Sequence, residues 1–176
     1  PVFRDAFALD TETTLIDHER PWLVPTYVLG AACDGEHGVF LTRAQLPAFL
    51  RAHDGVPLVF HNAPFDLAVI HQLVPQLDIY RHVERGKVWD TQLLHRLYTL
   101  ATAGHTAQGK GGSTLETCAA TYLGVALPKD DCDSHGNLVR LSFAQYLQRP
   151  PDEIEPVYLE YVAQDTLATY LVYMEL

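Results

Sequence analysis

Apolar residues follow two different periods along the 176-residue chain, and these periods divide it into strands and helices. Short apolar or alternating runs bounded by turn-forming or charged residues predict β-strands. The predicted strands are 5–12, 26–33, 38–42, 56–62 and 87–91. Longer stretches whose apolar residues recur every three or four positions predict helices. The predicted helices are 43–53, 62–75, 92–100, 114–124, 142–147 and 151–176.

Polar and glycine residues mark where several of these helices begin and end. Asn62 is a favourable N-cap for the helix that follows it. Ser113 and Glu116 have the spacing of a capping box, and Gly124 stands where the same helix closes. The segment 101–113 is rich in glycine and small residues, which predicts a mobile loop.

The order of the predicted elements is typical of an α/β fold. Three strands come first, further strands then alternate with helices, and the chain ends in helices. Gly35 and Gly38 punctuate the link between strands 26–33 and 38–42, which predicts an antiparallel hairpin. We therefore expect a mixed β-sheet flanked by α-helices, in a single domain, 1–176, excised from a longer protein.

Composition narrows the class of protein. Hydrophobic residues make up 48% of the chain, enough for a core, and no stretch is long and apolar enough to span a bilayer. The net charge of -10 argues against a general basic coat for nucleic acid, although local cations or bound metals can hold phosphates. Three cysteines without a CxxC motif favour a reducing, cytoplasmic compartment, and no signal peptide is visible.

Two carboxylates follow the first apolar run. Asp10 and Glu12 are two positions apart, so both side chains project from the same face of a strand. Adjacent carboxylates raise each other's pKa unless a cation lies between them. Either both side chains lie in water at a strand end, or they form a seat for a metal ion.

Two further groups place acids on helices. Asp66 falls in the first turn of a helix that follows a strand end, and ligands collect at such ends in α/β sheets. Stabilisation by the helix dipole is the simpler explanation for Asp66 alone. Tyr161 and Asp165 are four positions apart on a helix, so they are neighbours on one face. A simple hydrogen bond between them is the alternative to a catalytic role.

Together these groups point to hard cations. Four carboxylates without a Cys or His partner suit Mg²⁺ or Mn²⁺. Two such ions about 3.5–4 Å apart are the arrangement that cleaves phosphodiesters by in-line displacement. The repelling carboxylates would then be a metal seat.

The same residues carry a resemblance to a known family. The sequences DTET, HNAPFD and YVAQD resemble, in order, the three motifs of the DEDD 3′→5′ exonucleases. Tyr161 matches the tyrosine branch, because Glu160 stands where the other branch has a histidine. This branch includes ribonuclease D and the proofreading domains of family A DNA polymerases. The resemblance implies a ribonuclease H-like fold.

Roles for the acidic residues follow from the resemblance. It implies that Asp10, Glu12 and Asp165 bind a first divalent metal ion, Mg²⁺ or Mn²⁺. Asp10 would bridge to a second ion, with help from Asp66. Tyr161 would orient the attacking water and receive its proton.

The resemblance also implies contacts with the substrate. Asn62 would support the site or the substrate strand, and the backbone near Thr13 would meet the terminal nucleotide. An apolar side chain after the first motif wedges against the last base in proofreading relatives. Leu15 or Ile16 could take this role, and ordinary core packing is the simpler alternative for both.

The resulting hypothesis is a metal-dependent 3′→5′ exonuclease that acts on single-stranded DNA ends, beside a polymerase domain in the same or a partner chain. One alternative keeps the chemistry and changes the substrate to RNA, as in ribonuclease D. The other is a catalytically inactive structural or binding module of the same fold. The complete set of five motif residues argues against an inactive module.

Other charged positions have simpler explanations. Lys110 lies in a glycine-rich loop that does not match a phosphate-binding P-loop. Arg81, Arg85 and Lys87 either contact a nucleic-acid backbone or form a solvated turn. Asp90 precedes a helix, and we interpret it as a cap rather than as a fifth acid of the site.

Overall fold

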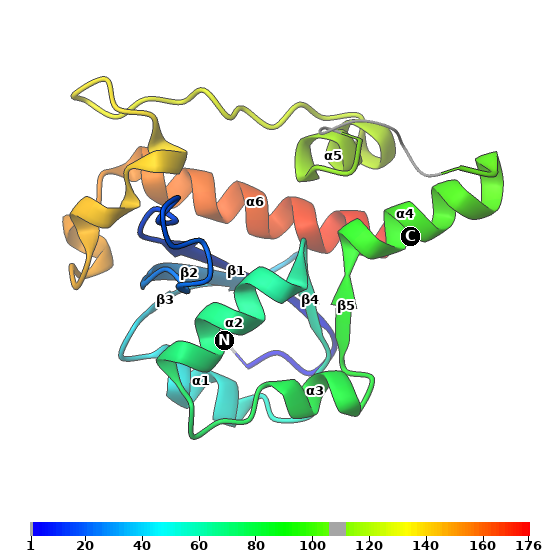
Figure 1. Ribbon diagram of the computed structural model, residues 1–176, viewed down its shortest axis with the longest axis horizontal. Helices are drawn as coiled ribbons and strands as arrows, with labels where there is room; N and C mark the ends of the chain where they lie inside the picture. Colours follow the sequence, from blue (N-terminus) through cyan, green and yellow to red (C-terminus); the bar gives the residue numbers. More distant parts are fainter. Residues whose placement is uncertain (1, 106–111) are drawn as a thin grey trace.

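The computed structural model describes residues 2–105 and 112–176 and has an α/β architecture around one five-stranded sheet (Figure 1). The strands are β1 (Phe7–Thr13), β2 (Tyr27–Cys33), β3 (Gly38–Thr42), β4 (Leu58–Phe60) and β5 (Val88–Asp90). The helices are α1 (Leu46–Ala52), α2 (Ala63–Leu73), α3 (Tyr80–Glu84), α4 (Thr91–Ala103), α5 (Leu115–Leu123) and α6 (Pro156–Glu175). Short 3₁₀ helices cover Val139–Leu141, Phe143–Tyr146 and Pro151–Glu153.

The sheet is mixed, as the sequence predicted. Its spatial order is β3-β2-β1-β4-β5. The pairs β1–β2 and β2–β3 are antiparallel, which confirms the predicted hairpin. The pairs β1–β4 and β4–β5 are parallel, because a helix-containing connection precedes each of these later strands. The first strand of the chain therefore lies at the centre of the sheet.

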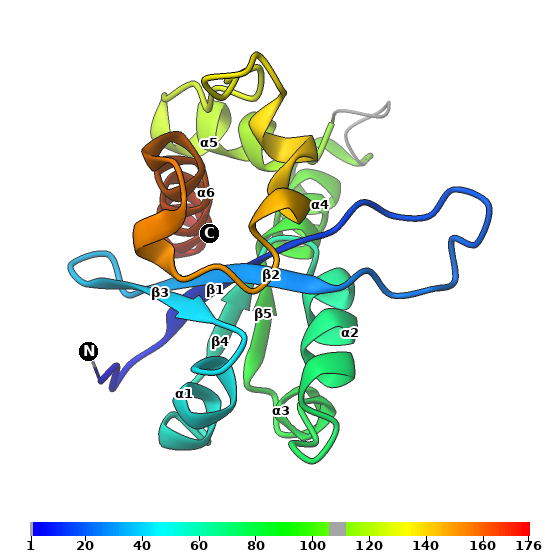
Figure 2. The ribbon, with the colours of Figure 1, turned by 90° about the vertical axis from the view of Figure 1, so that its left-hand side faces the viewer.

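Helices cover both faces of the sheet. Figure 2 shows α6 above the sheet, with α1, α2 and α3 below it. One core cluster packs between the sheet and the lower helices and includes Phe7, Leu9 and Ile70. A second cluster packs on the α6 side and includes Leu29 and Val162. Every residue of β2 is buried, because apolar layers lie against both of its faces.

Two boundaries differ from the sequence prediction around the glycine-rich segment 101–113. Helix α4 continues to Ala103 and ends at Gly104, whose φ of 74° is the left-handed conformation of a helix end. The first part of the predicted loop is therefore helical, and residues 106–111 lie outside the described residues. Helix α5 begins at the N-cap Thr114 and not at Ser113, because the hydroxyl of Thr114 accepts the backbone N–H of Thr117 (3.3 Å).

The other helix ends show how turns and prolines set boundaries. Gly124 closes α5 with a φ of 69°, as predicted. Helix α6 begins at Pro156, later than predicted, because the residues from Pro151 form a separate 3₁₀ turn. The five-residue helix α3 was not predicted, and it carries Arg81 on an exposed surface.

Candidate active site

The first acidic pair lies on the face of β1 that is turned toward α6. Asp10 pairs with Ala31 and Glu12 pairs with Leu29 across the β1–β2 ladder. Ala31 and Leu29 belong to the core cluster on the α6 side, so the two carboxylates project toward the same helix. The pairing register shifts directly after Glu12, and such irregularities re-aim side chains at the end of a strand.

Asp66 is tied to β1 from the opposite side. It is 3% exposed, in the first turn of α2. Its Oδ1 accepts the backbone N–H of Thr11 (3.1 Å) and the hydroxyl of Thr11 (2.6 Å). Thr11 lies between Asp10 and Glu12 in the strand, so this pair of hydrogen bonds fixes the third carboxylate beside the first two.

Helix α6 supplies the last pair, Tyr161 and Asp165, which are both buried. The ammonium of Lys129 donates to the hydroxyl of Tyr161 (3.1 Å) and forms an ion pair with Asp165. The same ammonium lies 4.5 Å from the centre of the Tyr161 ring. Lys129 therefore joins the two side chains at the face of α6 that meets β1.

Lys129 is a site residue that was not predicted from the sequence. It is the one cation in the connection 128–137, which is otherwise neutral or acidic apart from a histidine. A single lysine inside an acidic connection is the sequence pattern that could have indicated a role in the site. Its partners cannot be deduced from the sequence, because they lie more than thirty residues further along the chain.

The electrostatics of the carboxylates show that they share one site. Burial, with the charge of Asp165 as the next cause, raises the pKa of Asp10 to about 7. Burial also raises the pKa of Glu12 well above its usual value, with Asp10 and Asp165 as the next causes. The pKa of Asp66 rises for the same reasons, burial first and Asp10 second. Burial raises the pKa of Asp165, although Lys129 opposes this change.

The donor set fits a hard divalent cation in its chemistry. All four acidic side chains offer only oxygen, which Mg²⁺ and Mn²⁺ prefer. Their positions are different from those of a finished cage: among the described residues, no group of three or more His, Cys, Asp or Glu side chains is arranged to hold a metal ion. The ammonium of Lys129 offsets the charge of Asp165.

The prediction for Asn62 needs a correction. Asn62 precedes α2 with a left-handed backbone (φ 70°), and its side chain makes no capping hydrogen bond. The carboxylate of Asp90 accepts the backbone N–H groups of Asn62 (3.1 Å) and Ala63 (3.0 Å) instead. The exposed side chain of Asn62 is therefore not needed to start the helix.

Asp90 also caps its own helix, as predicted. Its carboxylate accepts the backbone N–H groups of Gln92 (2.9 Å) and Leu93 (3.3 Å) at the start of α4. One side chain thus holds the first turns of α2 and α4 together. Asp90 supports the helix that carries Asp66, and it takes no place among the four carboxylates.

The apolar residues after the first motif are exposed. The exposed fractions of Leu15 and Ile16 are 61% and 45%, so the alternative of core packing is wrong for both. Thr13 ends β1, and its hydroxyl donates to the carbonyl of Thr14 (2.8 Å). The apolar side chains of Leu15 and Ile16 are therefore exposed to solvent just beyond the end of β1.

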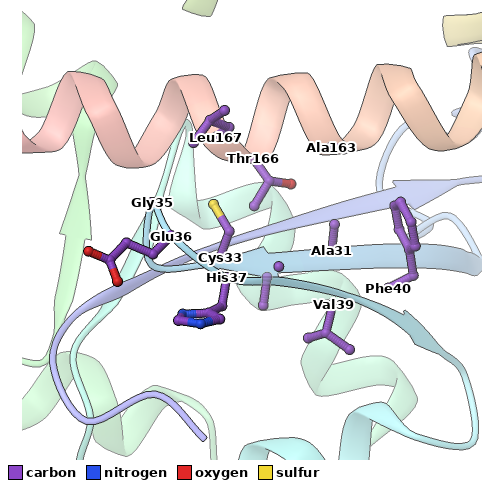
Figure 3. Close-up of a pocket in the computed structure, with 12 residues that line it drawn as sticks. Ala31, Cys33, Gly35, Glu36, His37, Val39, Phe40, Ala163, Thr166 and Leu167 are labelled. Carbon is purple, nitrogen blue, oxygen red and sulfur yellow. The ribbon is translucent and has the colours of Figure 1, made fainter. Parts of the chain in front are cut away.

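A cavity on the other flank of α6 is distinct from this site. It has a volume of about 320 Å³ and lies between α6 and the β2–β3 hairpin (Figure 3). Its lining is mainly apolar and includes Ala31, Val39 and Leu167. None of the four site carboxylates lines it, so we do not assign the chemistry to it.

The mixed sheet and the three acidic motifs define the class of protein, an exonuclease of the DEDD superfamily. A family model described as 3′-5′ exonuclease matches residues 4–176. The chain therefore belongs to this family and is a 3′-5′ exonuclease enzyme. A search of curated proteins found no match.

Solved structures with the same fold come from distant relatives. The Nibbler EXO domain of Aedes aegypti has a TM-score of 0.67 at 16% identity, covering 98% of this chain and 77% of that one. Brucella melitensis NrnC with bound Mg²⁺ has a TM-score of 0.59 at 19% identity, covering 97% and 70%. Escherichia coli RNase D, an exoribonuclease, has a TM-score of 0.57 at 23% identity, covering 97% and 39%. The expected ribonuclease H-like fold is thereby confirmed.

Among the helices of the described ranges, none has the length and apolar character needed to cross a bilayer.

Proposed function

We propose that this domain removes nucleoside monophosphates from the 3′ end of single-stranded nucleic acid. The observation that carries the proposal is the convergence of four carboxylates and Tyr161 from β1, α2 and α6, in a chain of the 3′-5′ exonuclease family. Asp10, Glu12, Asp66 and Asp165 would hold two divalent ions, Mg²⁺ or Mn²⁺. When bound, these ions supply Lewis acidity that activates water and stabilises the leaving oxygen.

Tyr161 orients the attacking water in this proposal. Burial raises the pKa of its phenol, with the charge of Asp165 as the next cause, so the phenol keeps its proton at neutral pH. A protonated phenol donates a hydrogen bond, and it does not receive the proton of water. The hydrogen bond from Lys129 fixes its oxygen, and Asp165 lies one helical turn away.

The reaction is a hydrolysis. The water oxygen bonds to the terminal phosphorus, and the bond between that phosphorus and the 3′ oxygen of the preceding nucleotide breaks. The 3′ oxygen takes up a proton as it leaves. The products are a nucleoside 5′-monophosphate and a strand that is one nucleotide shorter.

We propose DNA as the preferred substrate, with proofreading beside a polymerase domain as the setting, in a reducing cytoplasm. The resemblance to the proofreading domains of family A DNA polymerases supports this choice of substrate, and the three free cysteines support a reducing compartment. RNA is the second candidate, favoured by the likeness to RNase D, whose structure is named as that of an exoribonuclease. We assign the backbone near Thr13 to contact with the terminal nucleotide and Asn62 to support of the site or the substrate strand. Leu15 or Ile16 would be the wedge against the last base.

One experiment tests the activity and chooses the substrate. A 5′-labelled single-stranded DNA and its RNA counterpart are incubated with the protein and Mg²⁺, Mn²⁺ or chelator. We expect a ladder that shortens from the 3′ end, needs metal and is faster for DNA. A faster RNA ladder would transfer the assignment to the RNA alternative.

Two variants separate chemistry from folding. Asp10→Asn should lower the rate more than about a hundredfold, because the loss of a shared metal ligand removes several kcal/mol of charge stabilisation. Asp54→Asn is the matched control, since Asp54 is exposed and pairs with Arg85 (3.5 Å) rather than with a residue of the three motifs. Folded wild-type protein that shortens neither strand with either metal would instead support an inactive binding module.

A further inference from the structure

The connection between β1 and β2, residues 14–26, forms a projecting ribbon that starts directly at the candidate site. Its base is closed by a hydrogen bond from the Thr14 N–H to the Thr26 carbonyl (2.9 Å). A second bond runs from the Thr26 N–H to the Thr14 hydroxyl (3.0 Å). Figure 2 shows this ribbon extending away from the sheet beyond the ends of β1 and β2. Only Thr13 separates the ribbon from Glu12.

The tip of the ribbon is folded by its own contacts. The carboxylate of Asp17 accepts the N–H groups of Glu19 (2.9 Å) and Arg20 (3.2 Å). The guanidinium of Arg20 returns to the same carboxylate (2.7 Å), and the Leu23 N–H donates to the Arg20 carbonyl (2.9 Å). These bonds fix the backbone on both sides of Trp22.

Apolar side chains on this folded tip are exposed to solvent. Trp22 is 73% exposed and Leu23 is 44% exposed, alongside the exposed Leu15 and Ile16 at the base. Tryptophan is a residue that proteins bury on average. Four exposed apolar side chains on one ordered ribbon form a surface of the kind that marks an interaction site.

The net charge of the chain indicates that this apolar surface contributes to the affinity for a single strand, because cations supply little of it. The chain has a net charge of -10, which repels a polyanion. Arg20 is paired with Asp17 and Lys129 is paired with Asp165. These two cations are therefore already engaged within the protein, and stacking of bases on aromatic rings is the other main source of affinity for single strands.

We propose that Trp22 stacks on a base of the substrate strand, on the 5′ side of the terminal nucleotide. This inference rests on the proposed function and adds its recognition chemistry, the open face of an unpaired nucleobase. Trp22 lies four residues before Thr26, which is at most about 14 Å along the chain. That length equals about four stacked bases. Bases inside a duplex are stacked on both sides and lack open faces, so Trp22 also favours single strands.

The first test reads Trp22 directly. The chain has two tryptophans, Trp22 and Trp89. Trp89→Phe leaves only the ribbon tryptophan, and Trp22→Phe is the matched protein that keeps only the other. Each is titrated with unlabelled single-stranded DNA, in chelator and again with Ca²⁺. We expect quenching in Trp89→Phe and none in Trp22→Phe. Equal quenching in both variants, or none in either, overturns the inference.

The second test locates the stacked base. A labelled oligonucleotide carries one abasic residue at each of the last six positions in turn, with Mg²⁺ present. Trp22→Ala should raise KM on the intact strand by about fivefold to a hundredfold and leave kcat unchanged. Trp22→Tyr should restore most of the loss. At one abasic position the wild type should match Trp22→Ala, because the stacking partner is missing.

The outcomes separate the inference from the function on which it rests. If Trp22→Ala keeps the wild-type KM on every strand while cleavage continues, the stacking role is wrong and the exonuclease assignment stands. If the wild type cleaves no strand but DNA still quenches Trp22, the ribbon binds single strands and the proposed function fails.

Discussion

At the scale of single residues, Gly30 shows how closely the strands must approach at the site. A Cβ atom there would lie 2.6 Å from the hydroxyl of Tyr27 and 2.9 Å from the backbone oxygen of Asp10. The Tyr27 hydroxyl reaches past Gly30 to donate to the Leu41 carbonyl (2.5 Å). Only a residue without a side chain leaves room for this bridge.

We expect Gly30→Ala to destabilise the protein by about 1–3 kcal/mol, because the new methyl group forces the strand of Asp10 outward. Urea unfolding measures the change, and exonuclease rate should fall with it. Gly38→Ala is the control, since its Cβ would meet only ordinary contacts at 3.7 Å or more. Equal stability of the two variants would contradict the prediction.

Lys129 is a second residue whose removal should change the free energy of unfolding in a definite direction. Without its ammonium, Asp165 loses the charge that opposes its raised pKa. We expect Lys129→Met to lower the free energy of unfolding in chelator by about 1–3 kcal/mol. Added Mg²⁺ should raise the melting temperature of this variant more than that of the wild type. Arg140→Met, at an exposed position, should change neither quantity.

At the scale of elements, Asp90 couples two helices. We expect Asp90→Ala to cost about 1–3 kcal/mol, more than one ordinary cap, because α2 and α4 both lose backbone partners. The rate should fall too, since α2 carries Asp66. Urea unfolding and the cleavage assay measure both effects. Asp78→Ala, an exposed position near α3, serves as the control, and a loss no larger than that of Asp78→Ala would sink the idea.

His61 links β4 to the start of α4 and to the residue before α5. Its Nδ1 meets the Thr91 hydroxyl (2.8 Å), and its Nε2 meets the Ser113 carbonyl (3.1 Å). Burial lowers its pKa from 6.5 to about 4, so the folded protein holds a neutral imidazole. The contribution of His61 to stability is therefore complete above pH 6.5 and is lost as the pH falls toward 4.

The expected size of this effect is about 1.4 kcal/mol per pH unit between those values. Chemical unfolding from pH 7 to pH 4.5 should therefore show a steeper loss for the wild type than for His61→Gln. The comparison of slopes removes the contribution of the acidic groups that both proteins share. Parallel slopes would mean that His61 is accessible to protons in the folded state.

Sequence periodicity predicted the strands and most helices, because the buried positions in each of them follow the regular spacing of a strand or a helix. The run through Phe7 and Leu9 is buried on both sides of β1, and the long period of α6 follows its packed face. Caps were harder to predict. Asn62 has the right residue type for a cap, but Asp90 reaches the same N–H groups from another strand. Such long-range competition leaves no local signal.

At the scale of the whole molecule, the fold brings four carboxylates together, and the residues around them do not fully neutralise their charge. Burial raises the pKa of Asp10 to about 7, so part of the Asp10 population carries a proton near neutral pH. Divalent cations bind the ionised form, so their binding should release protons, and apparent affinity should fall below pH 7. Calorimetric titration with Mg²⁺ in two buffers of different ionisation enthalpy measures the release. Asp10→Asn should release fewer protons, and identical heats in both buffers would count against the prediction.

The four acids were predictable as a set, since each motif has a fixed spacing within one element. Their mutual placement depends on the whole sheet, with β1 at its centre and α6 across it. Lys129 escaped notice because its role arises only when a loop crosses α6. The exposure of Leu15 and Ile16 likewise depends on the projection of the ribbon, which apolar composition does not reveal.

The separation of Asp10 and Asp165 along the chain determines how long after the first residue the second one is synthesised. A ribosome adds about 5–20 residues each second, so on the order of ten seconds pass between the two. Until α6 has left the exit tunnel and docked on β1, the nascent chain carries an acidic strand and no assembled centre. A nuclease built in this way becomes able to cut only after nearly the whole domain has been synthesised.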